Sequence, residues 1–514
     1  MDLGRRNLVR LGGGAVVAGS IATVAAGAAG AGPAGATPAT EAARGTTGRG
    51  SMDRKLIEYG WDMPGPEFLR DHLADMQDKP FDGLVFNLHE NRRLSDGRDD
   101  PANGPLTTIT NPFSLTPLTA ADLKLDILES LSWGRFRDNF LSVWTGWPKS
   151  EMNWFDESHW RVIRRNASAI ATAVKAARAT GIFFDEENYG HNQWAYVAHP
   201  GKTRQQVMDQ VRKRGAEFVR ALQQVKPDIK IYCLNGAYMW RYHREYFDSI
   251  NSPDISPSAT YVAFMDGMLD GLGRRATIID GGEAQFYFDE TTKWRLDGQF
   301  RESADYLLSA KNTEKYARTS QGSVVYSDLV SGNKAGFAFT PSYYPQLASA
   351  DFEAWTEHNV YQSLLDSEEY VWIYNEKMQW WTDNAYPGLQ AAITRARTKF
   401  DAGAALGFDL CKADGFADKD SRPAVVSSPT VEITGLTHRS TVRAGTRALL
   451  TLSSAGAGER RVEWYDNGRL VDASFGSPYL GAVTLGPGVH TLVARMFLDE
   501  GAHVTSNPIV VRAR

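Results

Sequence analysis

The sequence predicts an α/β fold: a (β/α)8 TIM-type barrel followed by a small all-β sandwich. Three observations predict it. Eight short apolar runs alternate with amphipathic stretches between residues 55 and 374, polar and acidic side chains follow the ends of those runs, and the last ninety residues carry only short β-type patterns. A parallel barrel satisfies the first two observations together, because it buries each strand and places all the strand ends on one rim.

The expected barrel strands are residues 56–61, 83–88, 139–145, 181–184, 229–234, 260–265, 276–279 and 370–374. Residues 67–76 show helical spacing, and 160–180 and 203–225 are the clearest helices, each between two strands as a β-α-β crossover requires. The last gap is irregular, because about ninety residues separate the last two strands, and a further possible strand lies at 336–339. An open doubly wound sheet is the alternative, but no glycine-rich nucleotide-binding turn follows the first strand.

The N-terminus carries an export pattern. Arg5 and Arg6 precede an uncharged, alanine- and glycine-rich stretch at 11–31, and Ala34-Gly35-Ala36 suits a cleavage site. This resembles a twin-arginine signal, which implies an extracytoplasmic protein that crosses the membrane folded. An uncleaved membrane anchor is the alternative. We expect a signal peptide at 1–36, a linker at 37–52, the barrel at 53–415 and the sandwich at 425–514.

Composition limits the classes of partner. Of 514 residues, 42% are hydrophobic and 23% are charged, and the formal net charge is −5. This charge argues against nucleic-acid binding, although local basic patches stay possible. No stable membrane insertion is expected after signal removal, and the sequence sets no oligomeric state. Cys233 and Cys411 have no metal-type spacing, so two buried thiols are favoured over a disulfide.

Acidic residues are concentrated where the predicted strands end. Asp185, Glu186 and Glu187 directly follow the fourth apolar run. Alternation along an extended strand would place Asp185 and Glu187 on one side and Glu186 on the other. Like charges crowded in this way raise the pKa of one carboxyl, which keeps an acid protonated near neutral pH. The other residues expected at this rim are Trp61, Asp62, His89, Trp144, Asn235, Asp266, Glu283, Tyr374 and Glu376.

Tryptophans point to a carbohydrate. Thirteen of the 14 tryptophans precede the C-terminal region, and many follow predicted strand ends. An indole offers a flat apolar face and an N–H donor, which suits a sugar ring. Core packing is the alternative for each of them.

These residues resemble the barrel glycoside hydrolases, in which strand four commonly ends in the proton donor and strand seven or a neighbour supplies the second carboxylate. The resemblance covers about residues 55–410 and rests on Asp185-Glu186-Glu187, Asp280-Gly281-Gly282-Glu283 and Asn375-Glu376. It implies Glu187 as general acid, Asp185 as its electrostatic partner and Glu283 as nucleophile or base, with Glu376 in reserve. Glu186 is expected to be structural. The register could differ by one residue, because Asn188 here follows the glutamates instead of preceding them.

The expected substrate contacts are Trp61, Asp62, His89, Trp144, Asn235, Asp266, Tyr374 and Trp381. No cofactor is expected. Two other functions stay open. Glu58, Asp62, His89, Asp185 and Glu187 could surround a divalent cation in a metal-dependent phosphodiesterase barrel, or the barrel could bind carbohydrate without cleaving it.

The C-terminal region has about seven expected strands. Its clearest features are a hairpin around Asp466-Asn467-Gly468 and a strand at 487–494. It resembles the immunoglobulin-like modules of secreted glycan-acting enzymes, which implies a two-sheet sandwich. A spacer role is favoured over glycan binding, because Trp464 is its only tryptophan and is expected inside the core.

Overall fold

The computed structural model describes most of the chain after residue 53. The described residues are 54–89, 110–146, 152–187, 193–236, 254, 256, 258–283, 308–316, 319–327, 351–375, 378–381, 385–408, 430–455, 459–467, 469–474, 479–498 and 503–514. The predicted signal and linker, Glu376, Cys411 and the possible strand at 336–339 lie outside them. None of the described helices is long and apolar enough to cross a membrane.

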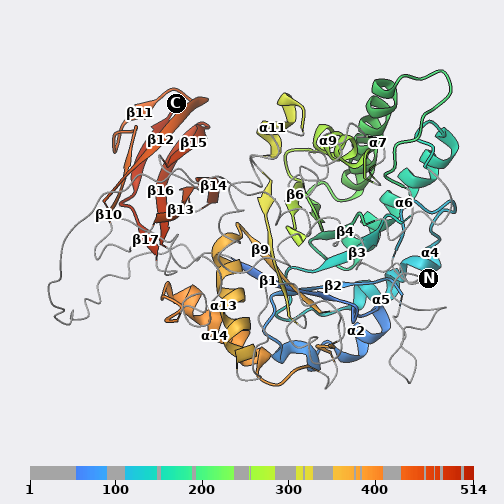
Figure 1. Ribbon diagram of the computed structural model, residues 1–514, viewed down its shortest axis with the longest axis horizontal. Helices are drawn as coiled ribbons and strands as arrows, with labels where there is room; N and C mark the ends of the chain where they lie inside the picture. Colours follow the sequence, from blue (N-terminus) through green and yellow to red (C-terminus); the bar gives the residue numbers. More distant parts are fainter. Residues whose placement is uncertain are drawn as a thin grey trace, which may run out of the picture. The chain divides into compact units, whose positions relative to one another are not determined.

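Parallel strands form a closed barrel, as predicted. The order is β7-β6-β5-β4-β3-β2-β1-β9-β8, with every pairing parallel. Figure 1 shows the strands inside a layer of helices that includes α6, α7, α13 and α14. The strands are β1 (Lys55–Gly60), β2 (Gly83–Phe86), β3 (Phe140–Trp144), β4 (Gly181–Asp185), β5 (Lys230–Cys233), β6 (Thr277–Asp280), β7 (Ser320–Gln321), β8 (Ser323–Tyr326) and β9 (Tyr370–Asn375).

Two short strands, β7 and β8, together occupy the seventh position of the barrel. Only Gly322 separates them; β7 pairs with β6, and β8 pairs with β9. The N–H of Gly322 donates to the carbonyl of Asp280 at 2.7 Å. A methyl group at residue 322 would lie 2.8 Å from the Tyr232 hydroxyl and 3.0 Å from that carbonyl. The break therefore occurs where only glycine fits without displacing a neighbour, and it lets eight strand positions close.

One predicted strand was wrong and one was missed. Residues 260–265 lie at the start of helix α9 (Tyr261–Gly271), so they form no strand. Consequently β6, expected as the seventh strand, is the sixth. The true seventh strand at 320–326 was not predicted. The apolar run that begins at Tyr261 continues to Leu269 with helical burial, and a run of six residues is too short for its periodicity to separate the two structures.

The major helices begin at capping residues. Asp156 accepts hydrogen bonds from the N–H groups of Ser158 and His159 at the start of α6. Thr203 and Gln206 form a reciprocal capping box at the start of α7. Such caps satisfy amide groups that a helix cannot bond internally. The helices are α2 (Pro66–His72), η1 (Asp75–Asp78), α4 (Ala120–Leu123), α5 (Leu125–Ser130), α6 (Glu157–Ala176), α7 (Arg204–Val225), α9, α11 (Ala310–Tyr316), α13 (Asp351–Asp366) and α14 (Leu389–Ala402).

Aromatic side chains fill the barrel interior. Tyr59 of β1 stacks on Phe183 of β4 with ring centroids 4.3 Å apart. Tyr232 of β5 and Trp372 of β9 lie 4.9 and 5.3 Å from Phe183. These contacts identify which residues of each strand point inward, because side chains alternate between the two faces. Phe183 and Asp185 therefore share the inner face of β4, whereas Glu58 lies on the outer face of β1.

A polar cluster closes the N-terminal end of the barrel. The Lys55 and Lys230 ammonium groups both pair with the carboxylate of Glu369. Lys230 also donates to the Tyr370 hydroxyl, which donates to Asp138, each at 2.7 Å. The described polar groups of this cluster are thus paired with one another.

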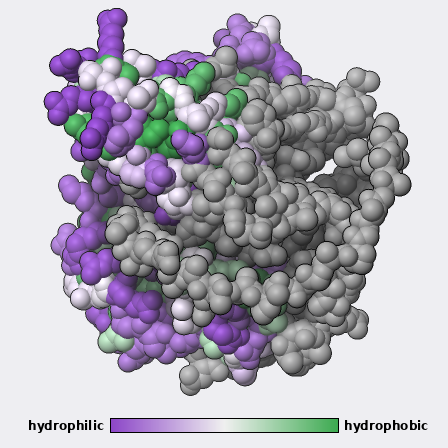
Figure 2. All heavy atoms as spheres, turned by 90° about the vertical axis from the view of Figure 1, so that its left-hand side faces the viewer, coloured by the Kyte–Doolittle hydropathy of each residue, from purple (hydrophilic) through white to green (hydrophobic). Residues whose placement is uncertain are grey.

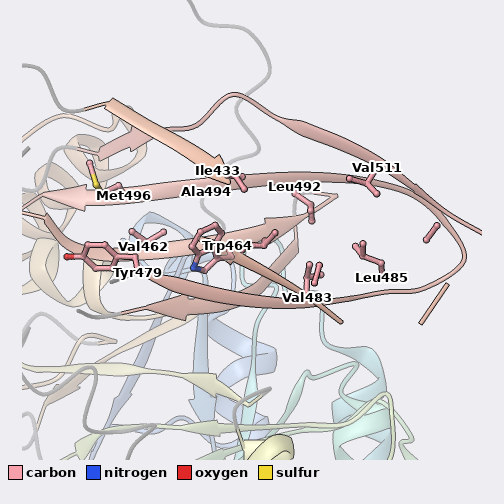
Figure 3. Close-up of a cluster of buried hydrophobic side chains, with 13 residues drawn as sticks. Ile433, Val462, Trp464, Tyr479, Val483, Leu485, Leu492, Ala494, Met496 and Val511 are labelled. Atoms are coloured by element: carbon pink, nitrogen blue, oxygen red, sulfur yellow. The ribbon is translucent and has the colours of Figure 1, made fainter. Parts of the chain in front are cut away.

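The C-terminal residues form two sheets around one core. The first sheet contains β10 (Thr430–Thr434), β12 (Thr446–Ala455) and β15 (Leu480–Leu485). The second contains β11 (Thr441–Val442), β13 (Glu459–Asp466), β14 (Arg469–Ser474), β16 (Gly488–Leu498), β17 (His503–Thr505) and β18 (Ile509–Ala513). Side chains of both sheets, including Trp464, Leu485 and Val511, meet in Figure 3. The all-β fold, the β13–β14 hairpin and the buried Trp464 are confirmed; the immunoglobulin type stays a prediction.

Hydrophobic residues on the coloured surface of Figure 2 are confined to small areas among hydrophilic ones. The large apolar side chains that the C-terminal sheets expose are Leu449, Leu480 and Val489. Leu449 and Leu480 lie diagonally across the pairing of β12 with β15, whereas Val489 lies on β16 of the second sheet.

We expect Gly322→Ala to lower the free energy of unfolding by about 1–3 kcal/mol, because the added methyl overpacks the junction of β6, β7 and β8. Denaturant unfolding followed by tryptophan fluorescence measures this change. Gly486→Ala is the matched control, since a methyl there meets no atom within 4 Å. Equal stability of the two variants would contradict the role assigned to Gly322.

Candidate active site

Carboxyl groups gather at the C-terminal rim, after β4 and β6. Asp185, Glu186 and Glu187 follow each other at the end of β4 and are 1%, 0% and 7% exposed. Glu283 follows β6 and is 7% exposed. Because β4 and β6 are separated only by β5, these groups converge in a small region.

Asn235, two residues after β5, connects the two groups of carboxyls. Its side-chain amide donates to Glu283 Oε2 at 3.0 Å, and its backbone N–H faces Glu186 Oε2 at 3.5 Å. The hydroxyl of Tyr261 in α9 donates to the Asn235 carbonyl at 3.3 Å. One residue thus holds an acid of β4 and an acid of β6 in fixed relation.

Burial raises the pKa of Glu186 well above its usual value, and the negative charges of Asp185 and Glu283 raise it further, against the hydrogen bond from Asn235. A carboxyl of this kind keeps its proton at a pH where an exposed glutamate is ionised. Glu186 was expected to be only structural, so the structure gives it a larger electrostatic part than the sequence suggested. The crowding of the three acids was visible in the sequence, but it did not identify Glu186 as the carboxyl whose pKa is raised.

Glu187 is positioned by its backbone. Its N–H donates to Asp185 Oδ1 at 2.9 Å, and its carbonyl accepts from the Trp144 indole at 2.8 Å and from Gln193 at 3.2 Å. The Asp185 carboxylate therefore turns the chain directly after β4. Simple strand alternation does not extend beyond Asp185, and the side of Glu187 is set by this turn.

Asp280, at the end of β6, ties together the loops that carry Asn235 and Glu283. One carboxylate oxygen accepts from the N–H groups of Gly236 at 2.9 Å and Gly282 at 3.1 Å. The other accepts from the Tyr316 hydroxyl of α11. A methyl group at residue 236 would lie 1.8 Å from Asp280, so glycine permits this approach. The sequence signal was an aspartate followed by two glycines.

Trp154 and Trp194, two of the tryptophans that follow predicted strand ends, pack together with Trp160 of α6 behind the carboxyls. Trp154 stacks on Trp160 and Trp194 with centroids 5.6 and 5.9 Å apart, and all three are buried. The Trp194 indole donates to the Glu186 carbonyl at 2.6 Å. The core alternative therefore holds for these residues.

Asp62 and Trp381 lie away from the barrel interior. Asp62 accepts from the Asn375 amide and from the N–H of Trp380, both at 2.7 Å, beside Glu58 on the outer face of β1. The Trp381 ring packs on Phe81 and Phe136 at 6.1 and 6.2 Å. Burial raises the pKa of both Glu58 and Asp62, and for Glu58 the neighbouring Asp62 charge adds to this rise.

The imagined metal set is consequently divided between the two faces of the wall. Glu58 is on the outer face, whereas Asp185 shares the inner face with Phe183. Among the described residues, no group of three or more histidine, cysteine, aspartate or glutamate side chains is arranged to hold a metal ion. Glu58 and Asp185 therefore do not face one common cation.

Asp266 was expected after a strand but lies in α9. Its carboxylate pairs with Arg212 at 2.8 Å and accepts from Ser309 and Asn312 at 2.9 and 2.7 Å. Since its helix is outside the strand wall, the reason for placing it at the rim does not hold.

The remaining expected contacts occupy different depths. Trp61 and His89 follow β1 and β2 and are half-buried, whereas Tyr374 is buried in the barrel with its ring 4.8 Å from Tyr326. Cys233 is a buried free thiol behind the site, as expected for one of the two cysteines.

No protein-family model and no curated protein sequence matches the chain. Among solved structures, the endo-β-1,4-mannanase from Thermotoga petrophila covers 90% of this chain and 98% of its own, with 7% identity and a TM-score of 0.34. A double mutant of the Cellulomonas fimi endo-β-1,4-mannanase covers 90% and 94%, with 11% identity and a TM-score of 0.33.

A calcium-binding mutant of Bacteroides uniformis β-glucuronidase 2 covers 90% of this chain and 45% of its own, with 10% identity and a TM-score of 0.32. Fibronectin(III)-like modules of Clostridium thermocellum CbhA cover 16% and 94%, with 21% identity and a TM-score of 0.16. These neighbours include glycosidases, but such low scores carry no argument, so the fold class rests on the strand order above.

We expect Asp280→Ala to lower the free energy of unfolding by about 2–3 kcal/mol, because it leaves the buried N–H groups of Gly236 and Gly282 without their acceptor. Tyr316→Phe removes one bond to the same carboxylate and should cost about 1 kcal/mol. Calorimetric unfolding compares the two. A smaller loss for Asp280→Ala than for Tyr316→Phe would contradict the role of Asp280.

The raised pKa values of Glu58 and Glu186 predict that the free energy of unfolding depends on pH. The unfolded carboxyls of Glu58 and Glu186 ionise near the usual 4.5, but the folded ones hold their protons longer. Each group therefore reduces stability as the pH rises from about 4.5 toward its folded-state pKa. Glu58→Gln and Glu186→Gln should match the wild type below that window and exceed its stability above it.

Urea unfolding from pH 4 to pH 8 tests this expectation. Glu129→Gln is the control, because Glu129 is exposed on α5. If the free energies of unfolding of wild type and the two glutamine variants differed by the same amount at every pH, the carboxyls of Glu58 and Glu186 would not have the raised pKa values on which this prediction rests.

Proposed function

We propose that the barrel is a glycoside hydrolase-like enzyme that cleaves glycosidic bonds in a poly- or oligosaccharide. Glu187 is the general acid, Asp185 its electrostatic partner, and Glu283 the nucleophile or base. Glu376 is the reserve for the second role. The observation that carries the proposal is the Asn235 bridge, which brings acids from the ends of β4 and β6 together.

Glycosidic cleavage needs one carboxyl that donates a proton and one carboxylate that attacks or activates water. A crowded, desolvated group of acids supports both states, because ionising one disfavours ionising the next. Glu187 and Glu283 are proposed for the chemical roles because each retains exposed surface, whereas Glu186 has none. Glu186 then acts as a proton-holding neighbour.

The proposal differs from the resemblance in one respect. Glu283 follows the sixth barrel strand, not the seventh. The pair therefore spans strands four and six. Trp61, His89, Trp144, Asn235 and Tyr374 are proposed as substrate contacts, with Trp144 and Asn235 also holding the acids in place.

We expect Glu187→Gln and Glu283→Gln to lower kcat by about 100- to 10,000-fold on a cleaved glycan, the range for loss of acid–base groups. Reducing-end assays on a panel of neutral and acidic glycans supply the substrate. Glu186→Gln should keep activity, because glutamine resembles the protonated acid, and Glu129→Gln is the surface control.

Loss of activity in Glu186→Gln with activity retained in Glu187→Gln would exchange their roles. Measurable glycan binding without cleavage of any glycan by the wild type would replace the hydrolase with a carbohydrate-binding barrel.

Export through the twin-arginine pathway is part of the proposal. Arg5→Lys combined with Arg6→Lys should keep the precursor inside an exporting host, since the pathway reads the arginine pair. Immunoblots of cell and medium fractions measure this. Unchanged export of the double variant would contradict the assignment.

A further inference from the structure

A cationic groove lies between helices α6 and α7, on the outer layer of the barrel. It has a volume of about 420 Å³. Its lining residues are Arg161, Arg164, Arg165, Ser168, Glu217, Arg220, Ala221 and Gln224. Four arginines face a single glutamate there, although the whole chain carries a formal charge of −5.

The arginines of this groove fall into two kinds. Arg164 is held by Glu157 at 2.6 Å and by Glu217 at 2.8 Å. Glu217 also forms an ion pair with Arg214 at 2.7 Å, so the one carboxylate that lines the groove is paired with two arginines. Arg161, Arg165 and Arg220 are exposed and make no hydrogen bond or ion pair within the described part of the chain. Three cations are therefore available to a ligand.

Two of these charged side chains lie on α6 and the third lies on α7, on the other side of the groove. Arg161 and Arg165 are one turn apart on α6, where like charges repel and cost about 0.2–0.5 kcal/mol in an isolated helix. Arg220 faces them from α7, which a hydrogen bond from Ser168 to the Ala221 carbonyl holds close to α6 at 3.3 Å. A bound anion would relieve the repulsion between the three charges.

Guanidinium groups bind planar or tetrahedral oxyanions through paired N–H donors, and Gln224 adds an amide donor. The separation of one helical turn is comparable with the length of one sugar unit. A polymer with an acid group on successive sugars can therefore meet several arginines at once, and each contact adds to the avidity.

We propose that this groove binds the carboxylate or sulfate groups of an acidic polysaccharide, as a second carbohydrate site outside the rim. The choice of a sugar polymer rests on the proposed glycosidase function; the need for an anion rests on the groove alone. The site would hold the polymer on the protein while the acids of the rim act on it.

Calorimetric titration with polygalacturonate, dextran sulfate and neutral dextran tests the proposal. The proteins are the wild type, Arg161→Gln/Arg165→Gln/Arg220→Gln, and Arg274→Gln/Arg275→Gln/Arg443→Gln, which removes the same charge from exposed sites elsewhere. We expect the groove variant to raise the Kd for at least one acidic polymer tenfold or more, the control variant to change it less than twofold, and neutral dextran not to bind. The acidic polymer that binds distinguishes carboxylate from sulfate.

Three results would overturn the proposal: equal weakening in both triple variants, tighter binding of a DNA duplex than of either acidic polymer, or full competition by inorganic phosphate at equal charge concentration. Arg165→Glu alone provides a second test if the triple variant loses its thermal transition, and it should weaken the same polymer.

The titrations are repeated with Glu187→Gln. Binding that persists there without cleavage separates the groove from the rim acids. Cleavage of a glycan by a wild type that binds no acidic polymer would reject the groove and leave the proposed hydrolase intact.

Discussion

The barrel closes through the backbone around Gly322. This residue donates to the carbonyl of Asp280 while the chain on its two sides bonds to different neighbours, β6 and β9. In the other seven positions one strand pairs with both neighbours, whereas here β7 pairs with β6 and β8 pairs with β9. The eightfold wall, and with it the common rim, depends on this junction.

Asp280 connects the closure of the barrel to the candidate active site. Its backbone carbonyl accepts a hydrogen bond from the N–H of Gly322. Its carboxylate accepts from the N–H groups of Gly236 and Gly282, in the loops that carry Asn235 and Glu283. A shift at the closing strand would therefore be transmitted directly to the acids. The stacked tryptophans behind β4 restrain the opposite side through the Glu186 carbonyl. Rigidity on both sides suits groups whose reactivity depends on their spacing.

Sequence patterns predicted the architecture better than the faces of its strands. The first six barrel strands and the last one were found because their apolar runs are bounded by polar residues, although β6 was expected in the seventh position. The extra strand expected at 260–265 was wrong, because the run at Tyr261 is equally compatible with a buried helix. The seventh position was missed because β7 has two residues and β8 has four, with Gly322 between them, and such short segments give no periodic signal.

Site residues were harder to rank, since strands covered on both sides show no alternation that separates inside from outside. Asp62 and Trp381 follow barrel strands as predicted, yet belong to a network on the outer wall. Asp185, Glu187, Asn235 and Glu283 do converge. The turn that fixes Glu187 depends on the Asp185 side chain accepting the backbone N–H of Glu187, which no spacing rule reveals.

The buried acids also alter the electrical character of the whole molecule. The formal charge of −5 counts every carboxyl as ionised. Glu58 on the outer wall and Glu186 at the rim hold their protons beyond the range of ordinary glutamates. While both stay protonated, the folded protein is two units less negative than its composition implies. Its isoelectric point in the native state should therefore lie above that of the unfolded chain, and unfolding at mildly acidic pH releases protons into the buffer.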